Sequence, residues 1–450
     1  MTMKKFSKIA FALLLAVTVV SCKKSEDEPA ASGGDNTVTL SGNLTTKTLD
    51  ASKKYRLEGL VYVTSGQTLT IPAGTLIIGD KASKAALIVS RGGKIVAQGT
   101  AANPIVFTSS APAGYRNAGD WGGIILCGKG ISNNGLNNVV EGPADFSIAN
   151  LGGSDNGLYG GTDAADNSGT LTYVRIEYAG ISYGANKEIN SLTMAAVGSG
   201  TTINHVQASY GGDDSFEWFG GSVDAKFLVA YKGWDDDFDT DNGYSGRVQF
   251  GVALRGTTLA DQSGSNGFES DNNATGGTET PITSGTFSNI SILGPLTFGS
   301  VINANYQHGA HVRRNSALNI YNSVILGFPT GVNFDKTNGT LKVKNNYFGG
   351  NTVASKFTAG NSNDTTGFVN GNKWGTIAAA LNDVTVESTA GLLKSGSAAT
   401  TGAVFTSALP GMDNSFWTNV SYLGAFGTSA DAEWNWTSGW LNWTPESTNY

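Results

Sequence analysis

The stretch INHVQASYGGDDSFEWFGGSVDAKFLVAYKGW (residues 203–234) contains two runs rich in β-branched and aromatic residues, INHVQASY and AKFLVAY. Segments of Gly, Asp and Ser separate them, and short runs between such turn residues are typical of strands. The second run begins at Ala225, 22 residues after the first begins at Ile203. A pattern that returns at this interval predicts that the chain forms one coil of strands and then stacks the next coil on it.

The same pattern continues on both sides of this stretch. The offsets between successive runs are 32, 22, 21, 41, 31 and 23 residues, and the runs begin at Leu171, Ile203, Ala225, Gly246, Phe287, Leu318 and Leu341. Longer offsets are expected where a loop is inserted into a coil. A β-propeller is the alternative, but its blades recur at roughly twice this period. We therefore predict an all-β fold, a right-handed parallel β-helix over residues 37–425.

Two early segments carry a family resemblance that agrees with this prediction. LTIPAGTLIIG (69–79) and LIVSRGGKIVAQGTAANPIVFTSS (87–110) resemble the first coils of many β-helix proteins, with Gly–Thr turns and an Asn-Pro pair before a strand. The resemblance implies the same solenoid fold.

The N-terminus has the order of a secretory signal. Lysines precede an apolar run at residues 9–20, which is too short to span a bilayer comfortably. The sequence VVSC (19–22) resembles the lipobox of bacterial lipoproteins, which implies cleavage after residue 21 and lipid attachment to Cys22. Residues 22–36 are charged and then rich in small residues, as in a flexible tether. The acidic patch after Cys22 resembles the surface-export signal of Bacteroidetes lipoproteins, so we expect a lipid-anchored outer-membrane protein at the cell surface.

The composition excludes some classes of function. Cys127 is the only cysteine besides Cys22, so no disulfide is expected within the mature chain. The net charge is −7 and no basic patch is present, so nucleic acid is not an expected partner.

Three acidic segments align when the middle coils are placed one above another: GDDSFEWF (212–219), WDDDFDTD (234–241) and SNGFESDN (265–272). Each contains a Phe followed by an acid. Because side chains alternate along a strand, the three phenylalanines are predicted to form an inward row: Phe216, Phe238 and Phe268. The three acids are predicted to point outward from successive coils, with Asp237 and Asp241 flanking the middle one: Glu217, Asp239 and Glu269.

Carboxylates stacked about 4.8 Å apart repel one another. Solvated turn residues, protonation of some carboxylates and a bound cation are the three ways to relieve this repulsion. Ca2+ is the cation that fits best, because it takes six to eight oxygen ligands in flexible geometry and is abundant outside cells. DFDTDNG (237–243) also resembles the start of a helix-loop-helix calcium loop, but Asn242 replaces its glycine and Val248 its bidentate Glu. We therefore predict that any calcium is held by the solenoid.

The Asp-rich coils also resemble those of calcium-dependent polysaccharide lyases, which cleave uronate polymers. The resemblance implies that Asp213, Asp214 and Asp236 are ligands together with Asp237 and Asp239. It breaks at Glu269, where that family places a basic residue. Four other cations are substitutes in principle: Lys232, Arg255, Arg313 and Arg314.

A second enzyme family is a weaker match. β-Helical glycosidases combine paired aspartates with a His-Gly element and a downstream Arg, and QHGAHVRR (307–314) supplies such an element, but the order along the chain is wrong. We predict that His308 and His311 lie on opposite faces of a strand, because side chains alternate along it.

Aromatic residues near the acids suggest a glycan surface, and they are Tyr210, Trp218, Trp234 and Tyr244. At residues 426–450 the sequence AEWNWTSGWLNWTP predicts an aromatic cap over the last coil. Along its length the chain resembles uncharacterised β-helical surface lipoproteins of Bacteroidetes. We predict a non-catalytic surface lipoprotein that binds calcium and a glycan or a partner protein, with a calcium-dependent polysaccharide lyase as the alternative.

Overall fold

The computed structural model describes residues 36–143, 156–184, 187–337, 342–357, 365–385, 390–428 and 436–450. Residues from Asp35 to Tyr450 belong to one compact unit. The predicted signal segment and Cys22 lie outside the described residues. In the described part of the chain, no helix is both long and apolar enough to cross a membrane.

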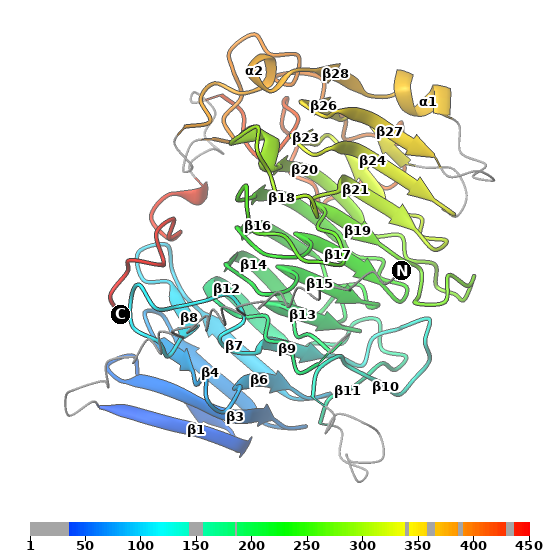
Figure 1. Cartoon of the computed structure of the whole chain (residues 1–450). Helices are drawn as coiled ribbons and strands as arrows, with labels where there is room; N and C mark the ends of the chain where they lie inside the picture. The colour runs from blue at the N-terminus through cyan, green and yellow to red at the C-terminus, as the bar shows by residue number, and fades with distance from the viewer. Residues whose placement is uncertain are drawn as a thin grey trace, which may run out of the picture. The chain divides into compact units, whose positions relative to one another are not determined.

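Parallel strands on three faces build this unit, and the predicted parallel β-helix is confirmed (Figure 1). In the middle coils one long strand belongs to two faces, its first half to the first face and its second half to the second. The shorter strands of the first face are β2 (Lys47–Thr48), β4 (Thr68–Pro72), β7 (Lys94–Gln98), β22 (Asn319–Tyr321) and β25 (Lys342–Lys344). The shorter strands of the second face are β5 (Leu76–Gly79), β8 (Ile105–Ser109), β23 (Val324–Leu326), β26 (Tyr347–Gly349) and β28 (Lys373–Gly375).

The long strands that belong to both faces are β12 (Gly169–Glu177), β14 (Thr202–Ser209), β16 (Ala225–Tyr231), β18 (Arg247–Leu254) and β20 (Thr286–Leu293). The third face consists of β6 (Ala86–Val89), β9 (Gly123–Cys127), β13 (Leu192–Ala195), β15 (Phe216–Phe219), β17 (Phe238–Asp241), β19 (Phe268–Ser270), β21 (His308–Arg313), β24 (Thr330–Asp335) and β27 (Val353–Phe357).

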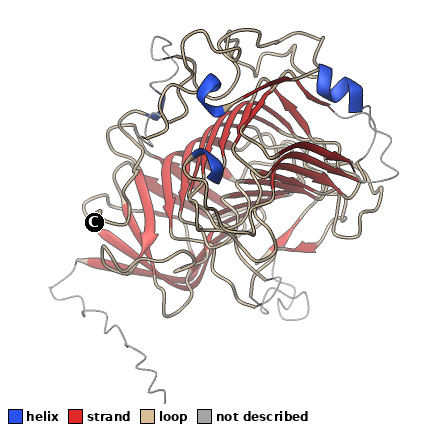
Figure 2. Cartoon of the chain, turned by 45° about the horizontal axis from the view of Figure 1, so that its top comes forward, coloured by secondary structure: helices blue, strands red, loops and turns tan. Residues whose placement is uncertain are grey.

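The remaining elements lie at the first coil and in connections. They are β1 (Thr37–Leu44), β3 (Lys54–Val63), β10 (Asn138–Val139), β11 (Leu158–Tyr159), the 3₁₀ turn η2 (Pro295–Thr297), α1 (Thr365–Asn370) and α2 (Ile377–Ala380). Figure 2 shows the strands stacked in layers, with loops joining successive coils.

The core lies between the three faces and contains the predicted row of phenylalanines. Phe216 pairs in register with Phe238, and Phe238 with Phe268. Their ring centroids are 5.8 and 5.4 Å apart, and all three side chains are 0% exposed. Burying a side chain of this size contributes about 1.5–3 kcal/mol to the free energy of unfolding. The predicted inward row is therefore confirmed.

Each long strand bends at one residue with positive φ, and these residues lie in register. Tyr173, His205, Phe227 and Phe250 occupy the bends of β12 to β18, with φ between 50° and 61°. Their rings stack with centroids 4.2, 4.4 and 5.2 Å apart. The stack offsets the strain of a left-handed backbone in residues other than Gly. Burial among these rings lowers the pKa of His205 to about 4.

The aromatic C-terminal segment is present, but it lies on the side of the coils. Trp440 contacts Tyr173 and His205 with centroids 5.8 and 5.5 Å apart, and Trp436 lies 5.3 Å from Phe227. Figure 1 shows this red segment reaching the neighbourhood of β8. The prediction that it covers the last coil is wrong, because its indoles bury themselves against the stacked rings of the bends.

Other aromatic residues cover the last coil. Phe368 of α1 packs against Phe334 and Phe348, with ring centroids 5.1 and 5.8 Å apart. Trp374 of β28 stacks on Phe348 at 5.0 Å. These side chains close the apolar end that a solenoid would otherwise expose.

Candidate functional site

Polar residues three positions apart form facing pairs where each coil enters its third-face strand. The register places Glu217, Asp239, Glu269 and His311 on successive strands β15, β17, β19 and β21. The predicted alignment of the three acids is confirmed. The residue three positions earlier in each coil faces this column, which gives the pairs Asp214/Glu217, Asp236/Asp239, Asn266/Glu269 and His308/His311. We call the first three pairs the acidic ladder.

The earlier member of each pair is fixed by backbone hydrogen bonds between coils. Asp214 Oδ1 accepts the backbone N–H of Asp236 at 2.7 Å, and Asp236 Oδ1 accepts that of Asn266 at 2.5 Å. Asn266 Oδ1 in turn accepts the N–H of His308 at 3.1 Å. Because these bonds run from coil to coil, the side chains are held in position by the solenoid. A short side-chain acceptor is needed at this turn, and Asp or Asn supplies it.

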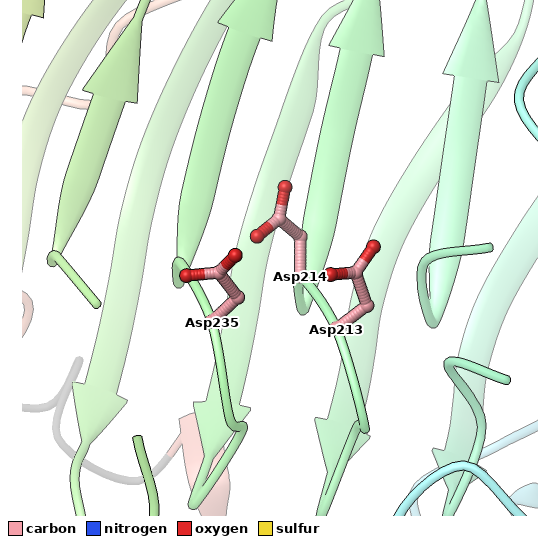
Figure 3. A group of neighbouring side chains, drawn as sticks. All are labelled: Asp213, Asp214 and Asp235. Carbon is pink, nitrogen blue, oxygen red and sulfur yellow. The ribbon is translucent and has the colours of Figure 1, made fainter. Parts of the chain in front are cut away.

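The acids converge into three groups in which one ligand atom from each residue lies within 4.8 Å of the others. The first triad is Asp213, Asp214 and Asp235, whose carboxyl groups lie close together on two adjacent coils (Figure 3). The second triad is Asp214, Glu217 and Asp239. The third triad is Asp236, Asp239 and Glu269.

Two carboxylate oxygens in these triads are buried without a hydrogen-bond donor among the described residues. They are Asp235 Oδ1 in the first triad and Asp239 Oδ1, which belongs to the second and third triads. A buried acceptor without a donor carries a desolvation cost of about 1–3 kcal/mol. A hard cation relieves that cost, and Ca2+ accepts carboxylate oxygens in a flexible coordination geometry. The carboxylate ligands of the three triads therefore suit a calcium ion.

The site is strained electrostatically when no cation is bound. Burial raises the pKa of Asp214, Glu217 and Asp236 well above the ordinary range, and neighbouring carboxylates raise it further. Burial raises the pKa of Asp235 to about 7 and that of Asp239 to about 6, although Arg313 opposes the rise at Asp239. Protons and cations therefore compete for these oxygens near neutral pH.

Six of the eight predicted ligands are in the triads, and the other two have different environments. Asp237 faces away and pairs with Arg255 across 2.9 Å, with both side chains 0% exposed. Burial raises the pKa of Asp237 to about 6 against the opposing effect of Arg255. Asp241 lies in the next outward column of β17, where its Oδ1 accepts the N–H of Asn242 at 2.6 Å. Neither carboxylate joins a triad.

Asp235 is a triad member that the sequence interpretation did not include among the ligands. It lies in the turn before β17, where strand alternation gives no guide to side-chain direction. The repeat itself carried the signal, because Asp213 and Asp235 occupy the same position in GDDSFE and DDDFD.

Two of the predicted glycan-contacting aromatics are core residues. Trp218 and Tyr244 are 0% exposed, and their rings stack with centroids 5.3 Å apart. Tyr244 also donates its hydroxyl to the carbonyl of Val223 at 3.0 Å. The prediction that they face a ligand is therefore wrong, because Trp218 lies two positions after Phe216 and shares its inward direction.

The other two aromatics are accessible. Tyr210 is half-buried and stacks on Tyr178 at 5.4 Å. Trp234 is 40% exposed and directly precedes Asp235 of the first triad. Its backbone carbonyl accepts bonds from Ser265 Oγ at 2.6 Å and Arg255 Nη2 at 3.1 Å, so the backbone beneath the exposed indole is fixed.

The cations near the ladder are held by acids or rings. Arg313 contacts Glu269 and donates from Nε to Asp271 Oδ1 at 2.8 Å. Arg314 donates to the other oxygen of Asp271 at 2.6 Å. Lys232 lies over the ring of Tyr231 at 4.8 Å. Of the four predicted basic residues, Arg313 contacts a triad member, Glu269.

The two histidines after the acidic ladder lie together. The ring centroids of His308 and His311 are 4.8 Å apart, and His311 Nδ1 is 3.7 Å from Glu269 Oε1. The prediction that they occupy opposite faces is wrong, because His308 is the first residue of β21 and the pairing with β24 is interrupted at Gly309, which breaks the regular alternation. Burial lowers the pKa of both, to about 3 for His308 and about 4 for His311, so both rings are neutral at pH 7.

Comparison with known proteins identifies the family. The model of the pectate-lyase-like β-helix domain matches residues 42–441, so the chain belongs to that family. A search of curated proteins finds no match. Among solved structures, the chain is similar to the Dettilon tailspike protein, at 11% identity and a TM-score of 0.24. That match covers 71% of this chain and 64% of the tailspike chain.

The buried Asp237–Arg255 pair yields a stability prediction. Arg255→Ala leaves Asp237 as an uncompensated buried carboxylate, so we expect the free energy of unfolding to fall by about 3–5 kcal/mol. Arg56→Ala is the matched control, because its pair with Asp80 is partly exposed (33% and 14%) and its loss is expected to cost about 1 kcal/mol or less. Denaturant unfolding followed by circular dichroism measures both. Equal losses in the two variants would contradict the assigned role of the buried pair.

Proposed function

We propose that this protein is a lipid-anchored, surface-exposed β-helix that binds calcium in the acidic ladder and a glycan beside it, without catalysis. The observation that carries the proposal is the convergence of carboxylates from successive coils, with buried oxygens of Asp235 and Asp239 left without donors. In a solvated acidic turn, water would donate hydrogen bonds to the carboxylate oxygens, and none of them would be buried without a donor. A cation satisfies them and relieves the repulsion at the same time.

Calcium is the favoured ion for chemical reasons. The triads consist only of carboxylates, with no imidazole or thiolate ligand. Hard divalent cations prefer such oxygens, and Ca2+ tolerates irregular geometry better than Mg2+, which needs near-ideal octahedral coordination. The ion would hold adjacent coils together and leave coordination positions for a ligand at the half-buried first triad.

The glycan part of the proposal rests on Trp234. An indole that is 40% exposed beside the first triad offers an apolar ring face next to a cation site. Sugars stack on such faces and coordinate calcium through hydroxyl or carboxylate oxygens. Membership of the pectate-lyase-like β-helix family is consistent with a saccharide ligand. A partner protein that binds the same face is the remaining possibility within this proposal.

A calcium-dependent polysaccharide lyase is the second candidate. The observation in its favour is the position of a basic residue, Arg313, beside the acidic ladder. Burial lowers the pKa of this guanidinium, which lies against Glu269 at the end of the acidic ladder. As the base, Arg313 would remove the proton beside a uronate carboxylate. The C–O bond to the leaving sugar would then break, a C=C bond would form, and the leaving oxygen would take up a proton. The acids that bind Arg313 hold it as a protonated guanidinium, which disfavours this role.

Calcium is expected to stabilise the fold. Without a chelator, free Ca2+ at about 100 times Kd should raise the free energy of unfolding by about 2.7 kcal/mol. Asp239→Asn should abolish most of this increase, whereas Glu58→Gln, an exposed acid on β3, should not change it. Thermal unfolding with Ca2+ and with chelator measures the effect. Identical melting temperatures in the two conditions would overturn the calcium proposal.

Glycan binding is expected to need both calcium and Trp234. On an array of neutral and uronate polysaccharides, Trp234→Ala should weaken calcium-dependent binding about tenfold, which corresponds to about 1.4 kcal/mol. Tyr115→Ala is the control, because Tyr115 is also exposed, at 41%, and lies outside the triads.

Two results of the array experiment would oppose the proposal. If both variants bind as the unaltered protein does, Trp234 is not the glycan contact. Ultraviolet absorbance from an unsaturated product, lost in Arg313→Ala, would replace the non-catalytic proposal with the lyase.

The anchor is tested separately through Cys22. In cells that express the full chain, the protein should fractionate with the outer membrane and be cleaved by added protease. Cys22→Ser should release it into the soluble fraction, and Cys127→Ser should not, because Cys127 is buried in the fold. Membrane retention of Cys22→Ser would contradict lipid anchoring through this residue.

A further inference from the structure

The three triads are linked through shared carboxylates. Asp214 belongs to the first and second triads, and Asp239 belongs to the second and third. A carboxylate has two oxygens with two lone pairs each, so it is able to contact two ions at once, even where one lone pair accepts a backbone N–H. The three positions form a continuous row, with Asp214 and Asp239 as the links.

The spacing of the coils suits ions in adjacent positions. Glu217, Asp239 and Glu269 lie on consecutive strands in register, and such strands are about 4.8 Å apart. Two metal ions that share bridging ligands are typically about 3.5–4 Å apart, so the repeat places neighbouring positions near that separation.

The charge of the row exceeds what one ion neutralises. The triads contain seven different carboxylates, namely Asp213, Asp214, Glu217, Asp235, Asp236, Asp239 and Glu269. Arg313 pairs with one of them, Glu269. With all seven carboxylates ionised, a single divalent cation would leave about four negative charges in a largely buried cluster, and such a cluster repels strongly. Two or three divalent cations come much closer to balance.

Orphaned buried atoms along the row point independently to bound ions. Asp235 Oδ1 lies at the first triad, and Asp239 Oδ1 lies where the second and third triads meet. Asn190, which is 1% exposed, contacts Glu217 through its side-chain amide. Its own Oδ1 has no donor among the described residues. An amide oxygen is a further hard ligand beside the second triad.

We infer that the acidic ladder binds a row of at least two divalent cations at the same time, bridged by Asp239 and extended through Asp214. The inference rests on the proposed calcium binding and adds its stoichiometry and arrangement. Each ion joins two successive coils, so the row connects the coils of β15, β17 and β19 along the outer side of the third face.

The number of ions is tested by elemental analysis. Chelated full-length protein is equilibrated with Ca2+, separated from free ion by gel filtration, and analysed for calcium per chain. We expect two or three ions. Glu269→Gln should remove one ion, because Glu269 belongs only to the third triad. Asp239→Asn should remove the ions of both the second and third triads. Asp241→Asn is the matched control, since it removes a neighbouring acid outside the triads, and it should not change the count.

The arrangement is tested with Mn2+ as a paramagnetic substitute. Ions bridged by one carboxylate should give an exchange-coupled electron paramagnetic resonance spectrum at saturation, and Asp239→Asn should abolish that coupling. Circular dichroism of each variant establishes that the fold is retained.

Every outcome separates this inference from the proposed function. A count of zero would overturn both. A count of one would overturn the row and leave calcium binding intact. A count of two or more with an uncoupled Mn2+ spectrum would overturn the bridged arrangement.

Discussion

Parallel strands in successive coils are hydrogen-bonded about 4.8 Å apart, so each side chain lies directly over its equivalent in the next coil. This register makes every sequence repeat a column of like residues. In the core the outcome is favourable, because Phe216, Phe238 and Phe268 stack as a continuous apolar row. Outside, the same register places Glu217, Asp239 and Glu269 together, and like charges repel. One geometric rule thus produces both the stabilising row and the electrostatically costly column.

The chain offsets part of that cost with its own backbone. Asp214, Asp236 and Asn266 each accept an N–H from the following coil, so one oxygen of each side chain has a structural role. Asp239 Oδ1 and Asp235 Oδ1 are left without a hydrogen-bond donor in the described part of the chain. The acidic ladder therefore contains more carboxylate oxygens than hydrogen-bond donors to satisfy them.

The features that depend on strand register could be predicted from the sequence. The features that depend on a turn or on contact with a distant segment could not. The coil repeat gave the β-helix, the phenylalanine row and the alignment of the three acids. It did not give the pairing of residues three positions apart, although NSLT, DSFE, DDFD, NGFE and HGAH repeat that pattern at 190–193, 214–217, 236–239, 266–269 and 308–311.

Contacts between segments that are distant in the sequence could not be predicted from local sequence patterns. The pairing of Asp237 with Arg255 spans 18 residues and removes that carboxylate from the cation site. The burial of Trp218 follows from strand alternation, because Trp218 lies two positions after the inward-facing Phe216 on β15. The path of the C-terminal segment depends on the aromatic stack at the bends, a surface that exists only after the coils have assembled.

Hydrogen bonds from residues near the C-terminus join coils that are not neighbours, so we expect them to change how the solenoid responds to force and heat. In a simple solenoid each coil contacts only its neighbours, so the ends fray one coil at a time. Here Gln207 is hydrogen-bonded to Asn442, Gln249 to Thr418, and Asn322 to Gly424. Residues near the C-terminus therefore fasten several coils, from that of β14 to that of β22, to one another. A pull on either end is therefore expected to be shared across several coils at once.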